Sequence, residues 1–146
     1  MQISENLRQF SNTPTLLITA GDQTAKFFHA NDGTIEELDS FTIENPNYSD
    51  REGHFKRRSG GETLGSGSVL EENKQAVKNK FYHQLQERLD TISAEHPFDE
   101  IILLAPPHSI KDTEEHMQPK FRDKIDQRVK GNFTKDRPLA LLRRLE

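Results

Sequence analysis

The segment Glu100–Ala105 constrains the fold most, because five consecutive apolar residues follow its single charge. A strand that is apolar on both faces needs cover on both faces, as parallel strands have in α/β proteins. Pro97 lies before the run, and Pro106 and Pro107 end it, which leaves room for a strand rather than a long helix. The chain must therefore supply elements for both sides of a sheet in which this strand is central.

Three segments with strand patterns precede this strand, at Thr15–Ala20, Thr24–Ala30 and Thr34–Ile43. Gly21-Asp22 ends the first, and Asn31-Asp-Gly33 closes the second. These residue types tolerate the positive φ angles of tight turns. Short strands joined by tight turns form an antiparallel meander, so the first part of the chain is predicted to be a three-stranded one.

A long amphipathic helix is predicted at Glu71–Glu95. Its apolar residues recur at steps of three and four and so form one stripe; they are Val77, Phe81, Leu85, Leu89 and Ile92. Ser68 is a candidate N-cap with Glu71 three residues on, as in a capping box. We therefore expect this helix to pack along one face of the sheet.

The last third of the chain is predicted to contain a helix at Ser109–Asp126, broken or kinked by Pro119. A short strand or turn at Arg128–Lys135 and a final helix at Pro138–Leu145 follow. The predicted fold is α/β (α+β): a mixed β-sheet with an N-terminal three-stranded antiparallel meander and helices packed on it.

The length of 146 residues fits one domain. We assign residues 1–13 to a polar N-terminal segment, with a short helix at Glu5–Phe10, and residues 14–146 to the domain. The absence of cysteine excludes disulfides and thiol chemistry. The first twenty residues have no apolar run long enough for a signal peptide or a membrane span, so we expect a cytoplasmic protein without a membrane partner.

Residues 45–68 have no hydrophobic period and are predicted to form a long, basic, glycine-rich loop that is mobile or irregular. The total charge of −4 hides an asymmetry, because residues 51–80 carry seven bases and four acids, a net charge of +3. Lys56, Arg57 and Arg58 could contact phosphates or form an ordinary solvated charge run. Glycines allow the backbone to approach a polyanion closely. The candidate RNA-binding residues are Lys56, Arg57, Arg58, Gly60 and Gly61, with secondary help from Lys74 and Lys78.

Other ligand classes find little support. Gly60–Gly65 is followed by Ser66 and Gly67 without the lysine of a phosphate-binding loop, and no dinucleotide fingerprint is complete. No pair of histidines has the spacing of a helical metal site. His108 and His116 could share a helix face with Glu115 or Asp112, but solvated surface histidines are the favoured interpretation. We therefore predict no metal, no nucleotide cofactor and no other cofactor.

The order of elements and several motifs resemble the middle domain of archaeal and eukaryotic class I translation release factors. They resemble still more closely its bacterial relatives, many of which are labelled "host attachment protein" or "protein required for attachment to host cells". The resemblance covers roughly residues 14–146. The matching motifs are Leu16–Asp22, Ala25–Phe28, Ser59–Glu62, Phe98–Pro107, Asn132–Lys135 and Pro138–Leu145.

In release factors the loop before the long helix carries Gly-Gly-Gln, enters the peptidyl-transferase centre and promotes ester hydrolysis. The resemblance places Gly60, Gly61 and Glu62 at these positions. The glycines match, but a carboxylate replaces the neutral amide and would be repelled by RNA phosphates. The chain also has no room for the stop-codon-reading and partner-binding domains of a complete release factor.

Three hypotheses follow. The first is an RNA- or ribosome-binding module that lacks peptidyl-tRNA hydrolysis. The second is a host-attachment or other protein-interaction protein, as the family labels imply. The third is a hydrolase in which Glu62 is the general base and His54 its partner. We rank the third last, because an exposed loop does not desolvate a carboxylate, and we lean towards a protein that is not an enzyme.

Overall fold

The computed structural model describes residues 1–44 and 60–145. Five strands form one sheet in the order β3-β2-β1-β4-β5. Their bounds are β1 Thr15–Ala20, β2 Thr24–Asn31, β3 Thr34–Thr42, β4 Glu100–Ala105 and β5 Ile125–Lys130. The first three strands pair antiparallel, whereas β4 is parallel to both β1 and β5. The prediction of a mixed sheet that begins with an antiparallel meander is confirmed.

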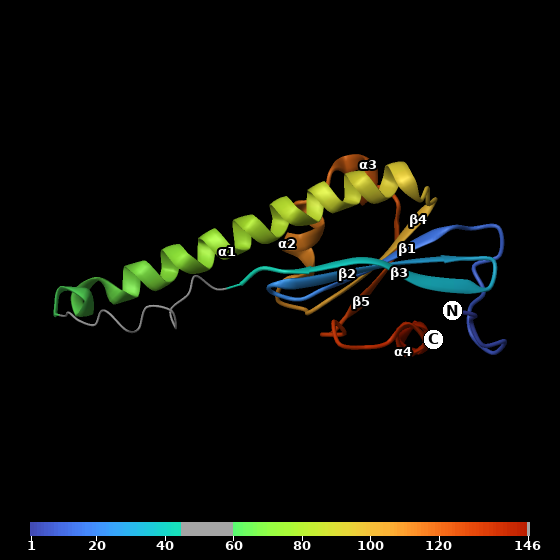
Figure 1. The fold of residues 1–146 in the computed structure, drawn as a ribbon, viewed down its shortest axis with the longest axis horizontal. Helices are drawn as coiled ribbons and strands as arrows, with labels where there is room; N and C mark the ends of the chain where they lie inside the picture. Colours follow the sequence, from blue (N-terminus) through green and yellow to red (C-terminus); the bar gives the residue numbers. More distant parts are fainter. Residues whose placement is uncertain (45–59, 146) are drawn as a thin grey trace.

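The helices cover both faces of this sheet. They are α1 Gly60–Glu95, α2 Ile110–Glu115, α3 Pro119–Arg122 and α4 Pro138–Arg144. In Figure 1, α1, α2 and α3 lie on one face and α4 lies on the other. The central strand β4 is buried along Ile101–Ala105, as its unbroken apolar sequence predicts.

Each sheet face has its own hydrophobic cluster. Leu16 and Ile18 of β1 pack with the helix side chains Phe81, Leu85 and Phe121 on the face covered by α1. The alternate residues of the sheet face the other way. There they contact α4 and the N-terminal segment in a second cluster that includes Ile3, Leu7, Phe10, Leu17, Phe28, Ile102, Leu141 and Leu142. Successive strand residues point to opposite faces, so one sheet supports both clusters.

The sheet-facing stripe of α1 is as predicted, because Val77, Phe81, Leu85, Leu89 and Ile92 are all buried. The stripe is reinforced by Arg88, whose Nη1 donates a hydrogen bond of 2.6 Å to Asp39 Oδ1 of β3. This side chain also donates to the backbone oxygen of Ser40, at 3.2 Å. Together these contacts tie the helix to the edge strand.

The prediction of an irregular loop at 45–68 is wrong for residues 60–68, because α1 begins at Gly60. Ser68 is therefore inside the helix and not its N-cap. A rise of 1.5 Å per residue makes this 36-residue helix about 54 Å long, and its N-terminal part projects past the sheet (Figure 1). Once a packed helix exists, each added residue costs no new nucleation, so the helix continues through glycines that disfavour it by about 1 kcal/mol each. Residues 45–59 lie outside the described part of the chain.

The predicted helix Ser109–Asp126 is wrong beyond residue 122. The chain forms the two short helices α2 and α3 there, and then enters β5 at Ile125. Pro119 lies at the start of α3, where its missing N–H costs nothing, so it begins a helix instead of kinking one. β5 alternates half-buried and exposed residues, as an edge strand does. It overlaps the strand or turn predicted at Arg128–Lys135 but begins and ends earlier, at Ile125 and Lys130.

The N-terminal segment forms turns, so the short helix predicted at Glu5–Phe10 is wrong. Phe10 and Asn12 have positive φ angles of 54° and 58°, which a helix does not contain. The predicted turn between β2 and β3 is present. Asp32 and Gly33 have φ angles of 44° and 81°, as the two central residues of a tight hairpin turn require.

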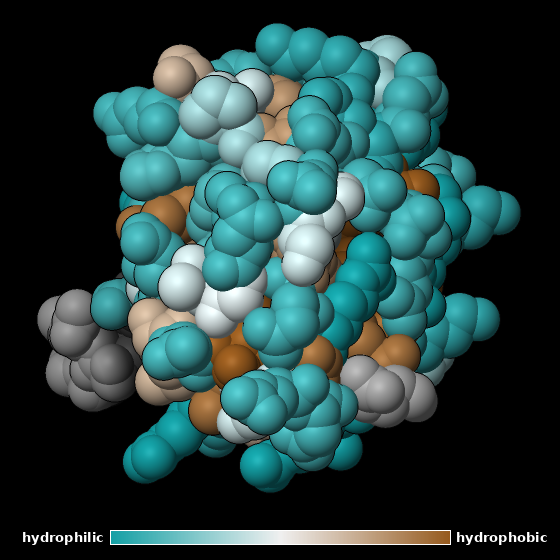
Figure 2. Space-filling view, turned by 90° about the vertical axis from the view of Figure 1, so that its right-hand side faces the viewer, coloured by the Kyte–Doolittle hydropathy of each residue, from teal (hydrophilic) through white to brown (hydrophobic). Residues whose placement is uncertain are grey.

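Figure 2 shows the end of the molecule that lies to the right in Figure 1. Its surface is mainly hydrophilic, and hydrophobic residues appear as small, separate spots. Within residues 1–44 and 60–145, no helix combines the length and apolar character needed to cross a membrane.

Candidate functional site

A cleft opens at the edge of the sheet where the parallel strands β1 and β4 end. Parallel strands of an open sheet leave a crevice beyond their carboxyl ends, where ligands commonly bind. The cleft has a volume of about 460 Å³, which is in the range of small-molecule sites. Its described lining comes from the turn after β1, the turn after β4, and the helices α1 and α2: Gly21, Asp22, Gln23, Lys74, Val77, Lys78, Phe81, Tyr82, His108, Ser109 and Asp112.

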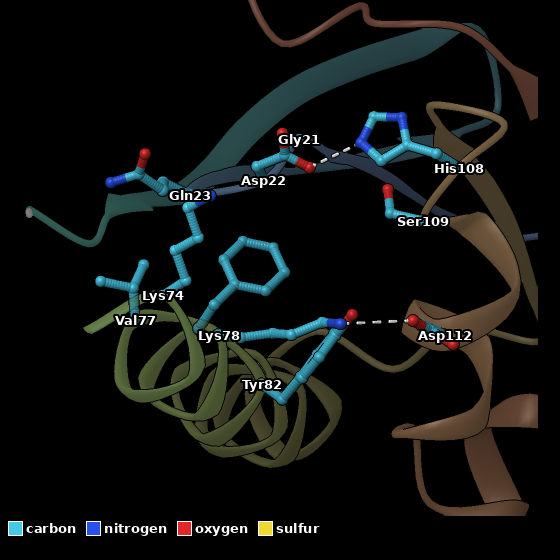
Figure 3. Close-up of a pocket in the computed structure, with 11 residues that line it drawn as sticks. Gly21, Asp22, Gln23, Lys74, Val77, Lys78, Tyr82, His108, Ser109 and Asp112 are labelled. Atoms are coloured by element: carbon cyan, nitrogen blue, oxygen red, sulfur yellow. Dashed lines mark hydrogen bonds and ion pairs between the residues drawn. The ribbon is translucent and has the colours of Figure 1, made fainter. Parts of the chain in front are cut away.

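Two lysines of α1 form one wall of this cleft. Lys74 and Lys78 are four residues apart, so they lie on the same side of the helix about 5–6 Å apart at Cβ. Both are exposed. Lys78 Nζ lies 3.5 Å from Asp112 Oδ2 of α2, and each side chain is about half exposed, at 49% and 47% (Figure 3). Such a pair is worth little in water, so Lys78 can exchange this partner for an incoming anion.

The two turns face each other across the cleft through Asp22 and His108. Asp22 Oδ1 and His108 Nε2 are 2.9 Å apart (Figure 3). The contact with the carboxylate orients the imidazole ring at the mouth of the cleft. Asp22 has a second carboxylate oxygen, and no dashed line between the residues drawn in Figure 3 ends on it. The pair therefore presents a hydrogen-bond acceptor beside a titratable ring.

The inner part of the cleft is apolar and aromatic. Val77 and Phe81 of the buried stripe line it together with Tyr82, so these residues serve both the core and the cleft. Tyr82 stacks on His116, with ring centroids 3.8 Å apart and planes 5° from parallel. Burial raises the pKa of the Tyr82 phenol above its ordinary value, so the hydroxyl stays protonated at neutral pH.

The structure brings together only some of the candidate residues. Lys74 and Lys78 share the cleft, whereas Gly60, Gly61 and Glu62 form the first turn of α1. The first turn is 14 residues from Lys74, which corresponds to about 21 Å along the helix axis. His54, Lys56, Arg57 and Arg58 lie outside the described residues.

Sequence reasoning overlooked Asp22 as a site residue and interpreted His108 and His116 as solvated surface groups. His108 contacts Asp22, and His116 covers Tyr82. One signal was available, because Gly21-Asp22 and His108-Ser109 each closely follow a buried apolar strand. Polar residues at the carboxyl ends of two neighbouring parallel strands meet at one edge of a sheet.

Comparisons with known proteins bear on this fold. A family model described as "Protein required for attachment to host cells" matches residues 16–145. No curated protein is found to match the chain.

Among solved structures, the chain is similar to one described as "Crystal structure of archaeal translation termination factor, aRF1". The TM-score is 0.52 and the sequence identity is 10%. The match covers 83% of this chain but only 31% of the archaeal factor, so the chain spans about a third of that protein. At this identity the similarity establishes a shared fold and no shared activity.

Proposed function

The chain belongs to the family of proteins required for attachment to host cells, and from that premise and its release-factor-like fold we propose that it is an RNA- or ribosome-binding module. The observation that carries the proposal is the fold shared with a translation termination factor over 83% of the chain. We further propose that the protein acts in the cytoplasm. The family description names a biological outcome, and it does not name a molecular contact.

The arrangement of α1 supports this proposal. The helix projects past the sheet (Figure 1), and the basic run Lys56–Arg58 ends two residues before its first residue, Gly60, in the sequence. A helix N-terminus carries a partial positive charge and free N–H groups that favour anions. Lysine and arginine side chains add affinity for a nucleic acid by releasing its condensed counterions.

The same position argues against peptidyl-tRNA hydrolysis. Glu62 stands where the release factors that the sequence resembles have glutamine. A carboxylate carries a negative charge towards RNA phosphates and lacks the amide's donor group. We therefore propose binding without ester hydrolysis. In a release assay on aminoacyl-tRNA esters, the wild type and Glu62→Ala should both match the rate without protein.

Ribosome co-sedimentation at a series of salt concentrations tests the binding. The protein should pellet with ribosomes at low salt, and replacing Lys56, Arg57 and Arg58 with Ala should weaken pelleting and lower the salt slope by up to about three counterions. The matched control replaces three exposed bases elsewhere: Lys130, Lys135 and Arg143. Melting temperatures report whether either triple variant has lost its fold. Equal pelleting and equal salt slope for wild type and the first variant would refute the role of the basic run, and no pelleting at low salt would refute ribosome binding.

A second candidate function is attachment through a protein partner, which the family description favours. Fractionation of the organism that makes the protein distinguishes the two functions. A pool confined to the cytosol supports the RNA-binding proposal, whereas a pool on the cell surface supports attachment.

A further inference from the structure

The cleft between β1, β4, α1 and α2 holds the two secondary RNA-binding candidates Lys74 and Lys78 together with groups that the RNA-binding proposal does not use. Its cations lie on one wall, its aromatic residues lie inside, and its carboxylates lie at two edges (Figure 3). This distribution suits a ligand with a strongly anionic end, an apolar planar body and hydroxyl groups.

The cationic wall fits a phosphate monoester. Lys74 and Lys78 are one helical turn apart, so both ammonium groups can reach the same small anion. A phosphate monoester carries about −1.5 to −2 charges at neutral pH and has three strong acceptor oxygens. A carboxylate carries a single negative charge, so it balances only one of the two ammonium charges. The present partner of Lys78 is the half-exposed Asp112 at 3.5 Å, which a phosphate can replace.

The inner part fits a planar ring. Val77, Phe81 and Tyr82 line it, and the small exposed part of each residue, 8%, 2% and 5%, offers an apolar contact to the face of a nucleobase. Tyr82 keeps a protonated hydroxyl that can donate to a base carbonyl. The stacking of His116 on Tyr82 holds the Tyr82 ring in place.

The turn after β1 supplies a carboxylate, that of Asp22, which can recognise a ribose hydroxyl. Asp22 uses Oδ1 for His108, at 2.9 Å, and its other oxygen can accept a hydrogen bond from a ribose hydroxyl. His108 lies beside it on an exposed turn with 66% of its side chain accessible. Both groups can therefore reach a ligand in the cleft without any movement of the core.

We propose that this cleft binds one nucleoside monophosphate unit, presented as the phosphorylated end of an RNA strand. The phosphate lies between Lys74 and Lys78, the base lies against Val77 and Phe81, and the ribose faces Asp22. The inference rests on the proposed RNA-binding function, and it specifies that the phosphorylated end of the RNA is the part recognised. It differs from nucleotide-cofactor binding by a glycine-rich phosphate loop, whose motif the sequence lacks.

Calorimetric titration of the full chain tests the proposal with defined probes. These are 5′-AMP, 5′-UMP, adenosine, inorganic phosphate, and a five-nucleotide RNA with or without a 5′-phosphate. We expect the two monophosphates and the phosphorylated RNA to bind measurably. Adenosine and inorganic phosphate should each bind at least about tenfold more weakly, because each lacks half of the recognised groups.

The variant Lys74→Ala/Lys78→Ala should weaken binding of the monophosphates by more than about tenfold, since it removes two charge-assisted contacts. The matched control Lys130→Ala/Lys135→Ala removes two exposed charges from another part of the surface and should bind like the wild type. Melting temperatures verify that both variants are folded. The variant Asp22→Asn keeps the shape of the side chain and should lower the affinity for 5′-AMP more than the affinity for 2′-deoxyadenosine 5′-monophosphate, which lacks the 2′-hydroxyl.

Two outcomes would overturn the cleft proposal. One is an equal affinity of the wild type and the double lysine variant for 5′-AMP. The other is binding of the unphosphorylated RNA as tightly as the phosphorylated RNA. If ribosome pelleting persists under either outcome, the cleft assignment fails while the proposed function stands. If the protein binds 5′-AMP but does not pellet with ribosomes, the cleft assignment stands while ribosome binding fails.

Discussion

Replacing Gly131 with Ala should destabilise the fold through one steric contact with Phe133. Gly131 follows β5, and its N–H donates to the backbone oxygen of Ala105 at 2.9 Å, which extends the sheet beyond the strand. Its φ angle is 154°, a value that residues with side chains rarely adopt. A Cβ atom added there would lie 2.3 Å from Phe133 Cζ and 2.8 Å from Cε2.

The magnitude follows from two separate costs. Carbon atoms prefer separations of about 3.5–4.0 Å, so the ring would have to move by more than about 1 Å. Overpacking of this kind typically costs about 1–3 kcal/mol, and a sparsely populated backbone conformation costs about 1–3 kcal/mol more. The expected loss in the free energy of unfolding is therefore about 2–6 kcal/mol. Phe133 packs against the second core cluster and lies under Arg144, 5.0 Å from its ring centroid, which limits its freedom to move away.

Urea denaturation of a double-mutant cycle separates the two costs. In the Phe133→Ala background the steric term disappears, so Gly131→Ala should cost only the backbone term of about 1–3 kcal/mol. Gly21→Ala is the matched control, because its added Cβ would lie 3.4 Å from Thr134 Cγ2 and its φ angle is not positive. It should change stability by less than about 1 kcal/mol. A cost for Gly131→Ala that is the same with and without the Phe133 ring would refute the steric argument.

Two further stability predictions concern α1 and the α2–β5 contact. Leu85→Ala should lower the free energy of unfolding by about 2–5 kcal/mol, since Leu85 is fully buried in the middle of the helix stripe. The control Gln75→Ala, on the exposed side of α1, should change it by less than about 0.5 kcal/mol. Equal urea midpoints for the two variants would contradict the packing. Arg128 donates to both oxygens of Glu114 at 2.7 Å and, through these bonds, lowers the pKa of Glu114. The Glu114→Gln variant should therefore be less stable than the wild type at pH 7 by up to about 1 kcal/mol. This difference should vanish in acid as the pH falls through the lowered pKa of Glu114, because a protonated Glu114 gains nothing from Arg128. A stability difference that is constant with pH would contradict the ion pair.

The strands could be predicted because their signals are local. β1 and β4 have the predicted bounds, since each is a short apolar run closed by turn residues or proline. β5 was harder. Ile125 and Val129 alternate with polar residues over only six positions, and the preceding Phe121 and Lys124 continue a helical spacing. Pairing with β4, which the sequence alone does not reveal, decides in favour of the strand.

The beginning of α1 could not be predicted for a different physical reason. Hydrophobic periodicity reports packing against a core, and the N-terminal part of the helix projects past the sheet (Figure 1). Residues 60–68 therefore carry no stripe, and their glycines favour a loop by local propensity. The helix there depends on continuation from the packed part, which is a property of the whole element.

The cleft illustrates a third limit, because its lining comes from segments far apart in the sequence. In the parallel register Thr19 pairs with Leu104, so the turns that carry Asp22 and His108 leave the sheet side by side. Each residue type was visible in the sequence, but their meeting depends on strand order. Ligands bind beyond the carboxyl ends of parallel strands in open sheets. This rule would have located the cleft once Thr15–Ala20 and Glu100–Ala105 were assumed to pair in parallel.

The geometry of α1 makes the two proposed contacts with RNA physically separate. Gly60 and Lys74 lie on one continuous helix, about 21 Å apart along its axis. That separation exceeds the screening length of about 8 Å at physiological salt, so charges at the first turn hardly change the local potential at Lys74 and Lys78. The basic run precedes Gly60 in the sequence, so we expect substitutions in it to act on the salt dependence of RNA binding. Substitutions in the cleft should act on recognition of the phosphorylated end. A single strand that contacts both places would bind more tightly than either contact alone, because the second contact is made at a high effective concentration.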